Sequence, residues 1–331
     1  MSAVAASPNA FSPSLTFRRL LGNGTLIAFV IYIIFYAIYA SRQPDALSGS
    51  AIMELMNNSL PLALAAGGGT LVVLTRGFDL SVAGVMALSN VIIATQVGGG
   101  VQGALLGLAM VVAVGLTVGA INGALVAYAR LQSIASTLAT MIVCSGASLL
   151  VLNAPGGNVP NFIANDLTGV VAGVPVAALI AGVVVLIWLA VRRTDWGVGL
   201  YATGADETAA GLAGIDTRRV KFIAYCLAGV MYALAGYMLS ALTATGDPNS
   251  GTSYLLLTFA AIALGGTAFT GGRGGVVGSM IGAAILALLE KLLFSIGVAS
   301  FYTGIFQGIV MVVAILLAAF SERLSHRVGA S

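Results

Sequence analysis

The chain has 331 residues, of which 59% are hydrophobic and only 8% charged, and its mean hydropathy is +1.04. An ordinary soluble domain carries about 25% charged residues, so 14 basic and 11 acidic side chains cannot cover a soluble protein of this size. The composition predicts a protein embedded mostly in lipid and excludes a soluble secreted, nuclear or cytosolic one. The net charge of +3 is small and scattered, which argues against nucleic-acid binding.

Long apolar runs divide the chain into membrane-spanning segments. A helix needs about 20 residues to cross a hydrocarbon core of about 30 Å. The runs are continuous and lack the polar–apolar alternation of a β-barrel, so they predict helices. We therefore expect an all-α polytopic membrane protein with about ten transmembrane helices, near 23–40, 59–75, 80–97, 103–129, 134–152, 170–191, 222–243, 254–270, 275–296 and 304–320.

The distribution of lysine and arginine predicts the orientation of these spans. If both termini are cytoplasmic, only Arg42 and Lys291 of the 14 basic residues lie toward the outer side, as the positive-inside rule requires. The chain then has a cytoplasmic N-terminal tail (1–22), one transmembrane domain (23–320) and a cytoplasmic C-terminal tail (321–331). Its first apolar run follows a polar stretch and resembles a retained anchor rather than a cleavable signal peptide.

No catalytic or metal-binding pattern is visible. Neither of the two lysines, Lys221 and Lys291, stands in the G-x-x-x-x-G-K-[ST] pattern that cradles phosphates. Cys144 and Cys226 lie inside apolar runs and are interpreted as packing residues. We expect a protein that is not an enzyme, that hydrolyses no ATP by itself and that holds no metal or cofactor of its own.

The polar interval 192–221, on the predicted cytoplasmic side, contains a short helix by local pattern. Asp206 is suited to cap its start, Glu207 lies near its positive end, and Gly214 is suited to end it. One interpretation is a surface loop that joins two halves of the bundle. We prefer a docking helix, because small residues between the cap and the glycine let its backbone approach closely to another protein.

Polar side chains inside apolar runs are candidates for lining a solute pathway. The alternative for each is a hydrogen bond to its own helix or to a neighbouring one. The amides are the stronger candidates, since an unpaired amide is costly in lipid. The set is Asn57, Asn58, Asn90, Gln96, Asn122, Ser136, Thr137, Thr140 and Gln307.

Three segments resemble, in the same order, signatures of the membrane permeases of ribose-type ABC importers. LTRGFDLSVAG at 74–84 is similar to the family's glycine-Ile-Asp-Leu-Ser-Val-Gly signature. GADETAAGLAGI at 204–215 resembles its G-x-N-x-x-A-A-x-x-x-G-I loop, and AIALGGT followed by GGRG at 261–274 resembles its glycine-rich stretch. The resemblance extends over essentially residues 45 to 320.

The resemblance implies a permease subunit with the cobalamin-importer type of fold in the bacterial inner membrane. Two such subunits, two copies or this chain with a related one, pair around a central pathway. Two ATPase subunits that use ATP and Mg²⁺ dock beneath, and a periplasmic sugar-binding protein delivers the cargo. The 204–215 segment would be the coupling helix seated on the ATPase, with the residues Gly204, Asp206, Glu207, Ala209, Ala210, Gly214 and Ile215.

The chain departs from the family's pattern at three places. The signature turn, of which we single out Arg76, Gly77, Asp79, Ser81 and Gly84, has Arg76-Gly77-Phe78 where Gly-Gly-Ile is usual. Asp79 either pins this turn near a gate or, as we prefer, caps the following helix and is neutralised by Arg76. Asp206 replaces the usual asparagine, and Glu290-Lys291 replaces a neutral stretch. This pair either faces the binding protein at the outer mouth or only places Lys291 at the membrane interface.

The expected function is import of a monosaccharide or similar small hydroxylated solute by alternating access, driven by the partner's ATP hydrolysis. The competing class is an ion-coupled secondary transporter. Such transporters place ionisable groups midway across the bilayer, whereas the acidic residues here cluster at loops and at the ends of spans.

Overall fold

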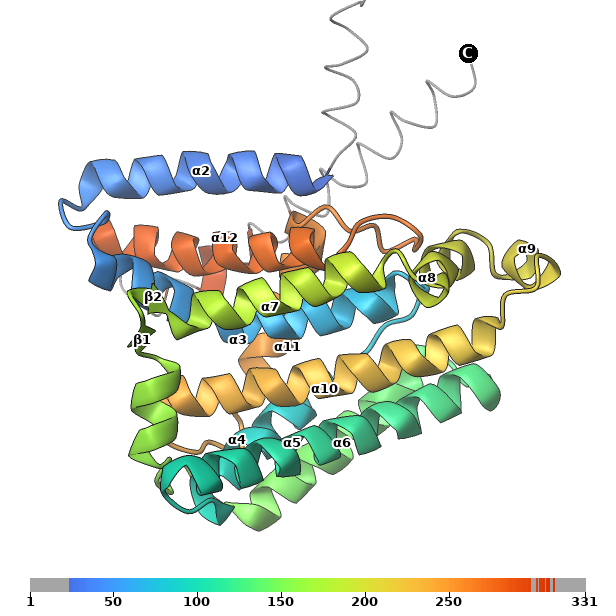
Figure 1. The fold of residues 1–331 in the computed structure, drawn as a ribbon, viewed down its shortest axis with the longest axis horizontal. Helices are drawn as coiled ribbons and strands as arrows, with labels where there is room; N and C mark the ends of the chain where they lie inside the picture. Colours follow the sequence, from blue (N-terminus) through green and yellow to red (C-terminus); the bar gives the residue numbers. More distant parts are fainter. Residues whose placement is uncertain (1–23, 299–301, 303, 307, 310–311, 313–331) are drawn as a thin grey trace, which may run out of the picture.

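The computed structural model describes residues 24–298, together with 302, 304–306, 308, 309 and 312. The two predicted tails and most of the tenth expected span lie outside these residues. Within them the chain is a bundle of helices with one small hairpin (Figure 1). The helices are α2 (Gly24–Arg42), α3 (Gly49–Val73), α4 (Val82–Gln96), α5 (Gly100–Gly123), α6 (Ser133–Val151), α7 (Val176–Val191), α8 (Asp195–Ala205), α9 (Glu207–Leu212), α10 (Thr217–Thr243), α11 (Thr252–Leu264) and α12 (Val276–Ser295).

Each of the first nine expected spans coincides with a helix, which confirms the helical prediction for that part of the chain. Among the described residues, five helices are long and apolar enough to cross a membrane, namely α2, α5 with the following π-helical turn η1 (Ala124–Tyr128), α6, α10 and α12. The bent pair α7 and α8, which turns by 79°, makes a sixth if it is one span. The number of ten crossings and the side on which each terminus lies remain predictions.

Several expected boundaries were wrong. Residues 170–175 are not helical: β1 (Val170–Val171) pairs with β2 (Val174–Pro175) across a tight turn in which Ala172 and Gly173 have φ of 50° and 82°, and α7 begins only after Pro175. Helix α3 starts ten residues earlier than expected because Ser48 caps it. The interval 192–221 holds the expected short helix as α9, and a second helix that was not expected, α8, precedes it.

The helices pack through small residues, which is how lipid-embedded helices approach one another closely. A Cβ on Gly119 would stand 2.4 Å from the Tyr225 carbonyl oxygen, so α5 and α10 approach backbone to backbone. A Cβ on Gly282 would stand 2.0 Å from the Ala261 oxygen, which brings α12 equally close to α11. Helix α10 lies at the centre, against α3, α4 and α5, and buries Tyr225 and Tyr232.

The two cysteines were expected to act as packing residues. Cys144 and Cys226 are free and buried, in agreement with a packing role.

A second π-helical turn, η2 (Phe162–Asp166), precedes the hairpin. At one end of the bundle α9 projects beyond the ends of α7 and α10, where it is available to another molecule (Figure 1).

Candidate functional site at the root of helix α9

Helix α9 forms as its sequence predicts. The Asp206 carboxylate accepts hydrogen bonds from the backbone N–H groups of Thr208 and Ala209, both at 2.9 Å, and thereby caps the helix start. Gly214 takes a left-handed conformation, with φ of 86°, just after the helix end, and Ile215 N–H bonds the Ala210 carbonyl. The short capped helix is therefore confirmed, and its use as a coupling helix stays a prediction.

Most of α9 faces outward. Asp206, Glu207 and Ala209 are exposed and Ala210 is buried against the bundle. Leu212, which the sequence analysis did not single out, is 87% exposed and is the bulkiest apolar side chain of the helix. A single exposed leucine is common on a surface, but at the tip of a projecting helix it is suited to fill a pocket on a partner.

Gly204 lies at the root of α9 and not on its exposed face. Gly272 N–H donates to the Leu74 carbonyl at 3.0 Å, and the backbone of Gly204 fits against both. A Cβ there would stand 1.8 Å from the Leu74 oxygen and 2.5 Å from the Gly272 nitrogen. Only glycine allows this approach of three backbone segments, so Gly204 acts in packing.

Arg76 ties the same three segments together with its side chain. Its Nε donates to the Thr270 carbonyl at 2.8 Å and its Nη2 to the Ala205 carbonyl at 2.6 Å. The expectation that Arg76 neutralises Asp79 was wrong, because the guanidinium points to these carbonyls instead. Arg76 also holds a left-handed backbone with φ of 64°, which costs a non-glycine residue about 1–2 kcal/mol.

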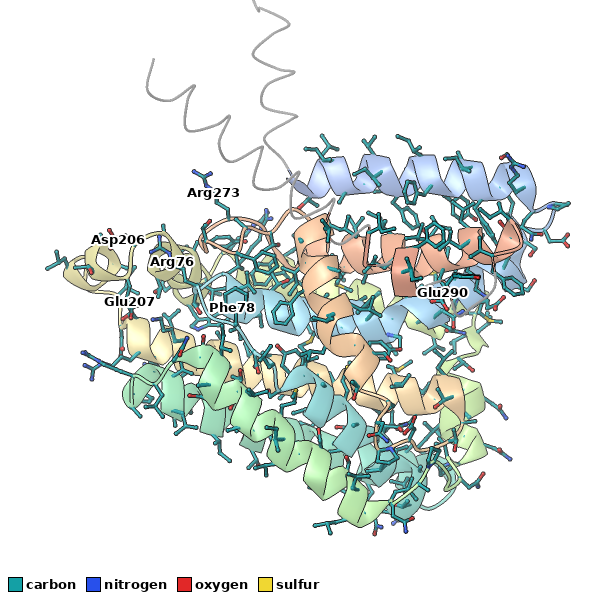
Figure 2. All side chains as sticks on the ribbon, turned by 180° about the vertical axis from the view of Figure 1, so that it is seen from behind. Arg76, Phe78, Asp206, Glu207, Arg273 and Glu290 are labelled. Atoms are coloured by element: carbon teal, nitrogen blue, oxygen red, sulfur yellow. The ribbon has the colours of Figure 1, made fainter. Side chains whose placement is uncertain are left out.

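Phe78 contacts the glycine-rich loop from the other side of the turn. Its ring stacks on Phe269, with centroids 5.7 Å apart and planes at 14°, and lies 5.8 Å from Phe259 of α11. Figure 2 shows Arg76 and Phe78 at the end of the molecule where Asp206 and Glu207 lie. Both departures from the family's signature turn thus form contacts with residues 268–272.

The three motifs that carry the resemblance therefore meet at one place, which we call the motif junction: Leu74, Arg76, Gly204, Ala205, Thr270 and Gly272. Residue Ala205 directly precedes the cap of α9. Hydrogen bonds and close backbone packing thus join the root of α9 directly to the turn between α3 and α4 and to the loop between α11 and α12.

Asp79 organises the turn itself. Its Oδ1 accepts from the N–H and the hydroxyl of Ser81, at 2.9 and 2.6 Å. Ser81, not Asp79, is the N-cap residue of α4, so Asp79 holds the residue that precedes the helix and does not cap it as expected. Asn122 Nδ2 donates to Ser81 Oγ, and Thr140 donates to Asn122 Oδ1, so α5 and α6 join the network. Asp79 lies in the turn outside the helices. Burial raises the pKa of its carboxyl to about 6, although the hydrogen bonds from Ser81 act to lower it.

Two glycines of the signature turn are needed for close packing around this network. A Cβ on Gly77 would stand 2.8 Å from the Tyr225 hydroxyl, and one on Gly84 would stand 2.6 Å from the Met141 carbonyl of α6. The signature segment is thus packed on both sides, and its residues hold helices together.

The predicted pathway amides are mostly occupied by contacts within the bundle. Asn90 donates to the Ser240 hydroxyl and the Thr245 carbonyl, and its Oδ1 accepts from Asp247 N–H at 2.7 Å. Asn57 Nδ2 donates to the Thr168 carbonyl at 2.8 Å. Asn58 is half-buried, and Gln307 lies outside the described residues. A pathway role for these amides remains a prediction.

Charged residues of α3 and α12 occupy the opposite end of the bundle. Lys291 forms an ion pair with Glu54 of α3, a partner that the sequence analysis did not foresee. Glu290 is exposed, and Figure 2 shows it far from the motif junction. No cluster of metal-ligating side chains occurs among the residues searched, 24–298 and the few described beyond them.

The apolar helices define a multi-pass membrane protein, and comparison with known proteins assigns it to a family of permeases. The chain belongs to the family described as branched-chain amino acid transport system / permease component, whose model matches residues 51–315. Within it the chain is a ribose-type permease of ABC importers, as its motifs predict, and a multi-pass protein of the bacterial membrane.

Curated relatives match nearly the full length. The chain is 35% identical over 305 residues to the ribose import permease protein RbsC of Escherichia coli K12, covering 90% of this chain and 94% of the relative. It is 35% identical over 301 residues to RbsC of Bacillus subtilis (89% and 91%). It is 30% identical over 323 residues to the fructose import permease protein FruF of Bifidobacterium longum (91% and 89%). No solved structure matches the chain.

Proposed function

We propose that this chain is the membrane-spanning subunit that carries a monosaccharide, or a similar small hydroxylated solute, through an ATP-driven importer. Relatives named for ribose import and fructose import support the substrate class. In this proposal the chain is a permease subunit and not an enzyme, and it binds no cofactor. Separate ABC ATPase subunits hydrolyse the ATP that drives transport. A binding protein on the outer side delivers the solute.

Helix α9 is the proposed contact with the ATPase, and the motif junction is the observation that carries this proposal. Closure of the ATPase dimer would shift α9 through its exposed residues. Because Gly204 and Arg76 join the root of α9 to the turn before α4 and to the loop before α12, the shift would tilt these helices together. This is the physical basis for alternating access in the proposal.

The proposed assembly has two permease subunits around a central pathway, each with ten spans and both termini in the cytoplasm. The two subunits are copies of this chain, or this chain and a related permease. In this orientation α9 lies on the cytoplasmic side, and Glu290 with the Lys291–Glu54 pair lies near the outer mouth, where a binding protein would dock.

The test is the complete complex, with ATPase subunits and binding protein, in lipid nanodiscs. ATP turnover is measured with ribose, xylose, galactose, fructose and a polyol in turn, and uptake is measured in proteoliposomes. We expect one solute class to accelerate ATP turnover, and uptake to stop with vanadate but to continue with a protonophore. Uphill transport by this chain alone, or uptake abolished only by the protonophore, would refute the proposal in favour of an ion-coupled transporter.

A further inference from the structure

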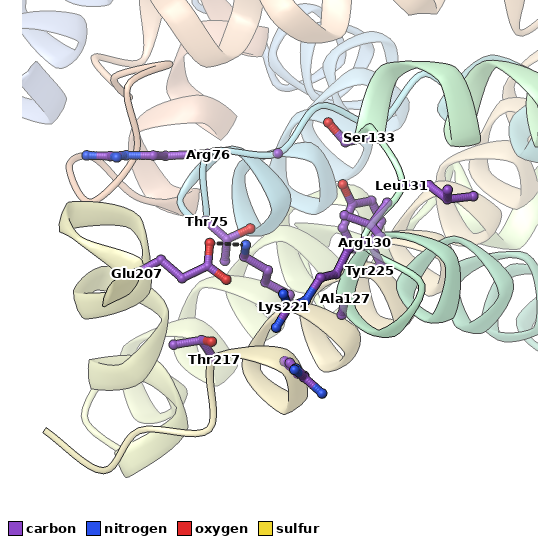
Figure 3. A pocket seen from close by; sticks show the side chains of 13 residues that line it. Thr75, Arg76, Ala127, Arg130, Leu131, Ser133, Glu207, Thr217, Lys221 and Tyr225 are labelled. Carbon is purple, nitrogen blue, oxygen red and sulfur yellow. Dashed lines mark hydrogen bonds and ion pairs between the residues drawn. The ribbon is translucent and has the colours of Figure 1, made fainter. Parts of the chain in front are cut away.

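A positively charged hollow lies beside α9. It has a volume of about 530 Å³ and is bounded by the turn after α3, the segment between α5 and α6, the first turn of α9 and the start of α10 (Figure 3). Its lining includes four basic residues, Arg76, Arg130, Arg218 and Lys221, and one acidic residue, Glu207. The formal charge of this lining, +3, equals that of the entire 331-residue chain, so the remainder of the protein is balanced and the excess is concentrated here.

The positive charge of the hollow is only partly compensated within the chain. Lys221 Nζ pairs with Glu207 Oε2 at 2.5 Å. Arg76 uses its guanidinium on two backbone carbonyls, which carry no net charge. Arg130 and Arg218 are exposed and form no ion pair with any residue that the structure describes. The guanidinium groups of Arg130 and Arg218 are therefore free to bind carboxylate or phosphate groups of another molecule.

The backbone around the hollow is strained at two of these arginines. Four non-glycine residues in the described part of the chain have positive φ, and two of them, Arg76 at 64° and Arg130 at 57°, line the hollow. Arg130 is held there by the end of the π-helical turn η1, where Leu131 N–H bonds the Leu125 carbonyl at 3.0 Å. Left-handed non-glycine residues are costly and tend to occur where function requires a particular side-chain direction.

We propose that this hollow is a second docking surface for the ATPase subunit and receives an acidic segment of it, beside the seat of α9. The proposal rests on the proposed function. Glu207 belongs both to α9 and to the lining of the hollow, so a protein that seats α9 also covers the hollow. Helix α9 projects past the ends of α7 and α10 (Figure 1), and its Glu207 lines the hollow, so the hollow lies at the end of the bundle where α9 would dock, which favours a protein over a lipid headgroup.

The physical consequence is a salt-dependent component of the contact between permease and ATPase. Unpaired arginines facing carboxylates raise the association rate and select the partner, and salt screens this attraction, whereas a contact through the exposed apolar side chain of Leu212 does not depend on charge. The arrangement would also restrict the ATPase to one orientation on the permease, since its acidic segment must enter the hollow while α9 occupies its own seat.

The experiment reverses the charges of the two unpaired arginines. The double variant Arg130→Glu/Arg218→Glu is compared with Arg192→Glu/Arg193→Glu, an equal change of charge at two exposed arginines between α7 and α8 that do not line the hollow. Binding of the ATPase subunit that copurifies with the wild-type chain is measured in nanodiscs at several salt concentrations. We expect the hollow variant to lose on the order of tenfold in affinity at low salt and to lose most of its salt dependence, with a much smaller effect in the control.

Three outcomes overturn the proposal while leaving the proposed function intact. The hollow variant could bind the ATPase as the wild type does, or the control could lose as much affinity. A loss that occurs only in nanodiscs containing phosphatidylglycerol, and not in pure phosphatidylcholine, would assign the hollow to a lipid headgroup. Thermal unfolding of each variant without ATPase verifies that it is folded, and an Arg130→Lys/Arg218→Lys variant that still binds supports a charge effect independently of folding. If the wild-type chain binds no ATPase at all, the proposed function fails instead.

Discussion

The close packing around Gly204 predicts that a single added methyl group at this residue destabilises the protein. Gly204→Ala places a Cβ 1.8 Å from the Leu74 carbonyl oxygen and 2.5 Å from the Gly272 nitrogen, whereas non-bonded carbon and oxygen atoms require more than 3 Å. Both neighbours are backbone atoms that cannot rotate away. The three segments of the motif junction must therefore separate, which breaks the 3.0 Å hydrogen bond from Gly272 to Leu74.

The expected loss of stability is about 2–4 kcal/mol, from about 1–3 kcal/mol for overpacking and about 1 kcal/mol for the broken hydrogen bond. Gly211→Ala is the matched control. Gly211 is seven residues away in α9, and a Cβ there meets nothing within 4 Å. Alanine is a better helix former than glycine by about 1 kcal/mol, so this change is expected to be neutral or stabilising.

Both variants are purified in detergent and unfolded thermally, and amide hydrogen exchange is measured for residues 74–81 and 268–274. Gly204→Ala should lower the unfolding temperature and speed exchange in both segments, whereas Gly211→Ala should do neither. If the two substitutions are tolerated equally, the close approach at Gly204 is not a feature of the protein, and the transmission path through the motif junction loses its basis.

Three further predictions concern the side chains of the site. Arg76→Gly relieves the left-handed strain but removes the hydrogen bonds to the Ala205 and Thr270 carbonyls. The unfolding temperature should therefore change little, while the amount of solute transported per ATP hydrolysed falls. Arg76→Lys should not restore this ratio, and an unchanged ratio in Arg76→Gly would contradict the role of Arg76. Leu212→Asp should weaken ATPase binding without lowering the stability of the isolated permease, because the side chain is 87% exposed; equal binding would exclude Leu212 from the interface. Asn90→Ala should cost about 1–3 kcal/mol by leaving Asp247 N–H without its acceptor, whereas a higher KM for transport at unchanged stability would instead mark Asn90 as a pathway residue.

Local patterns predicted the elements of this protein well. An apolar run of about 20 residues forms a helix in lipid because its backbone groups can be satisfied only within the segment, and the first nine expected runs are helices. The capping of α9 by Asp206 and its termination at Gly214 also depend on neighbours a few residues away. One exception is equally local: Gly173 and Pro175 belong to a hairpin at the start of the run 170–191, which was expected to be helical throughout.

The partners of individual side chains could not be predicted in the same way. The sequence places Arg76 three residues before Asp79, and an ion pair between them was the natural expectation. In the folded chain the backbone at Arg76 is left-handed, and the guanidinium instead reaches carbonyls 129 and 194 residues away in sequence. Likewise Asn90, a candidate for the pathway, is held by residues about 150 positions later.

Composition and spacing along the chain were enough to predict a membrane protein, most of its helices, the family it resembles and the short capped helix before α10. The folded structure was needed to show that the three family motifs meet at the root of α9 and that four basic residues from separate segments surround one hollow. Both arise from close approach between helices distant in sequence, which is set by where small residues let two backbones touch and which no local pattern encodes.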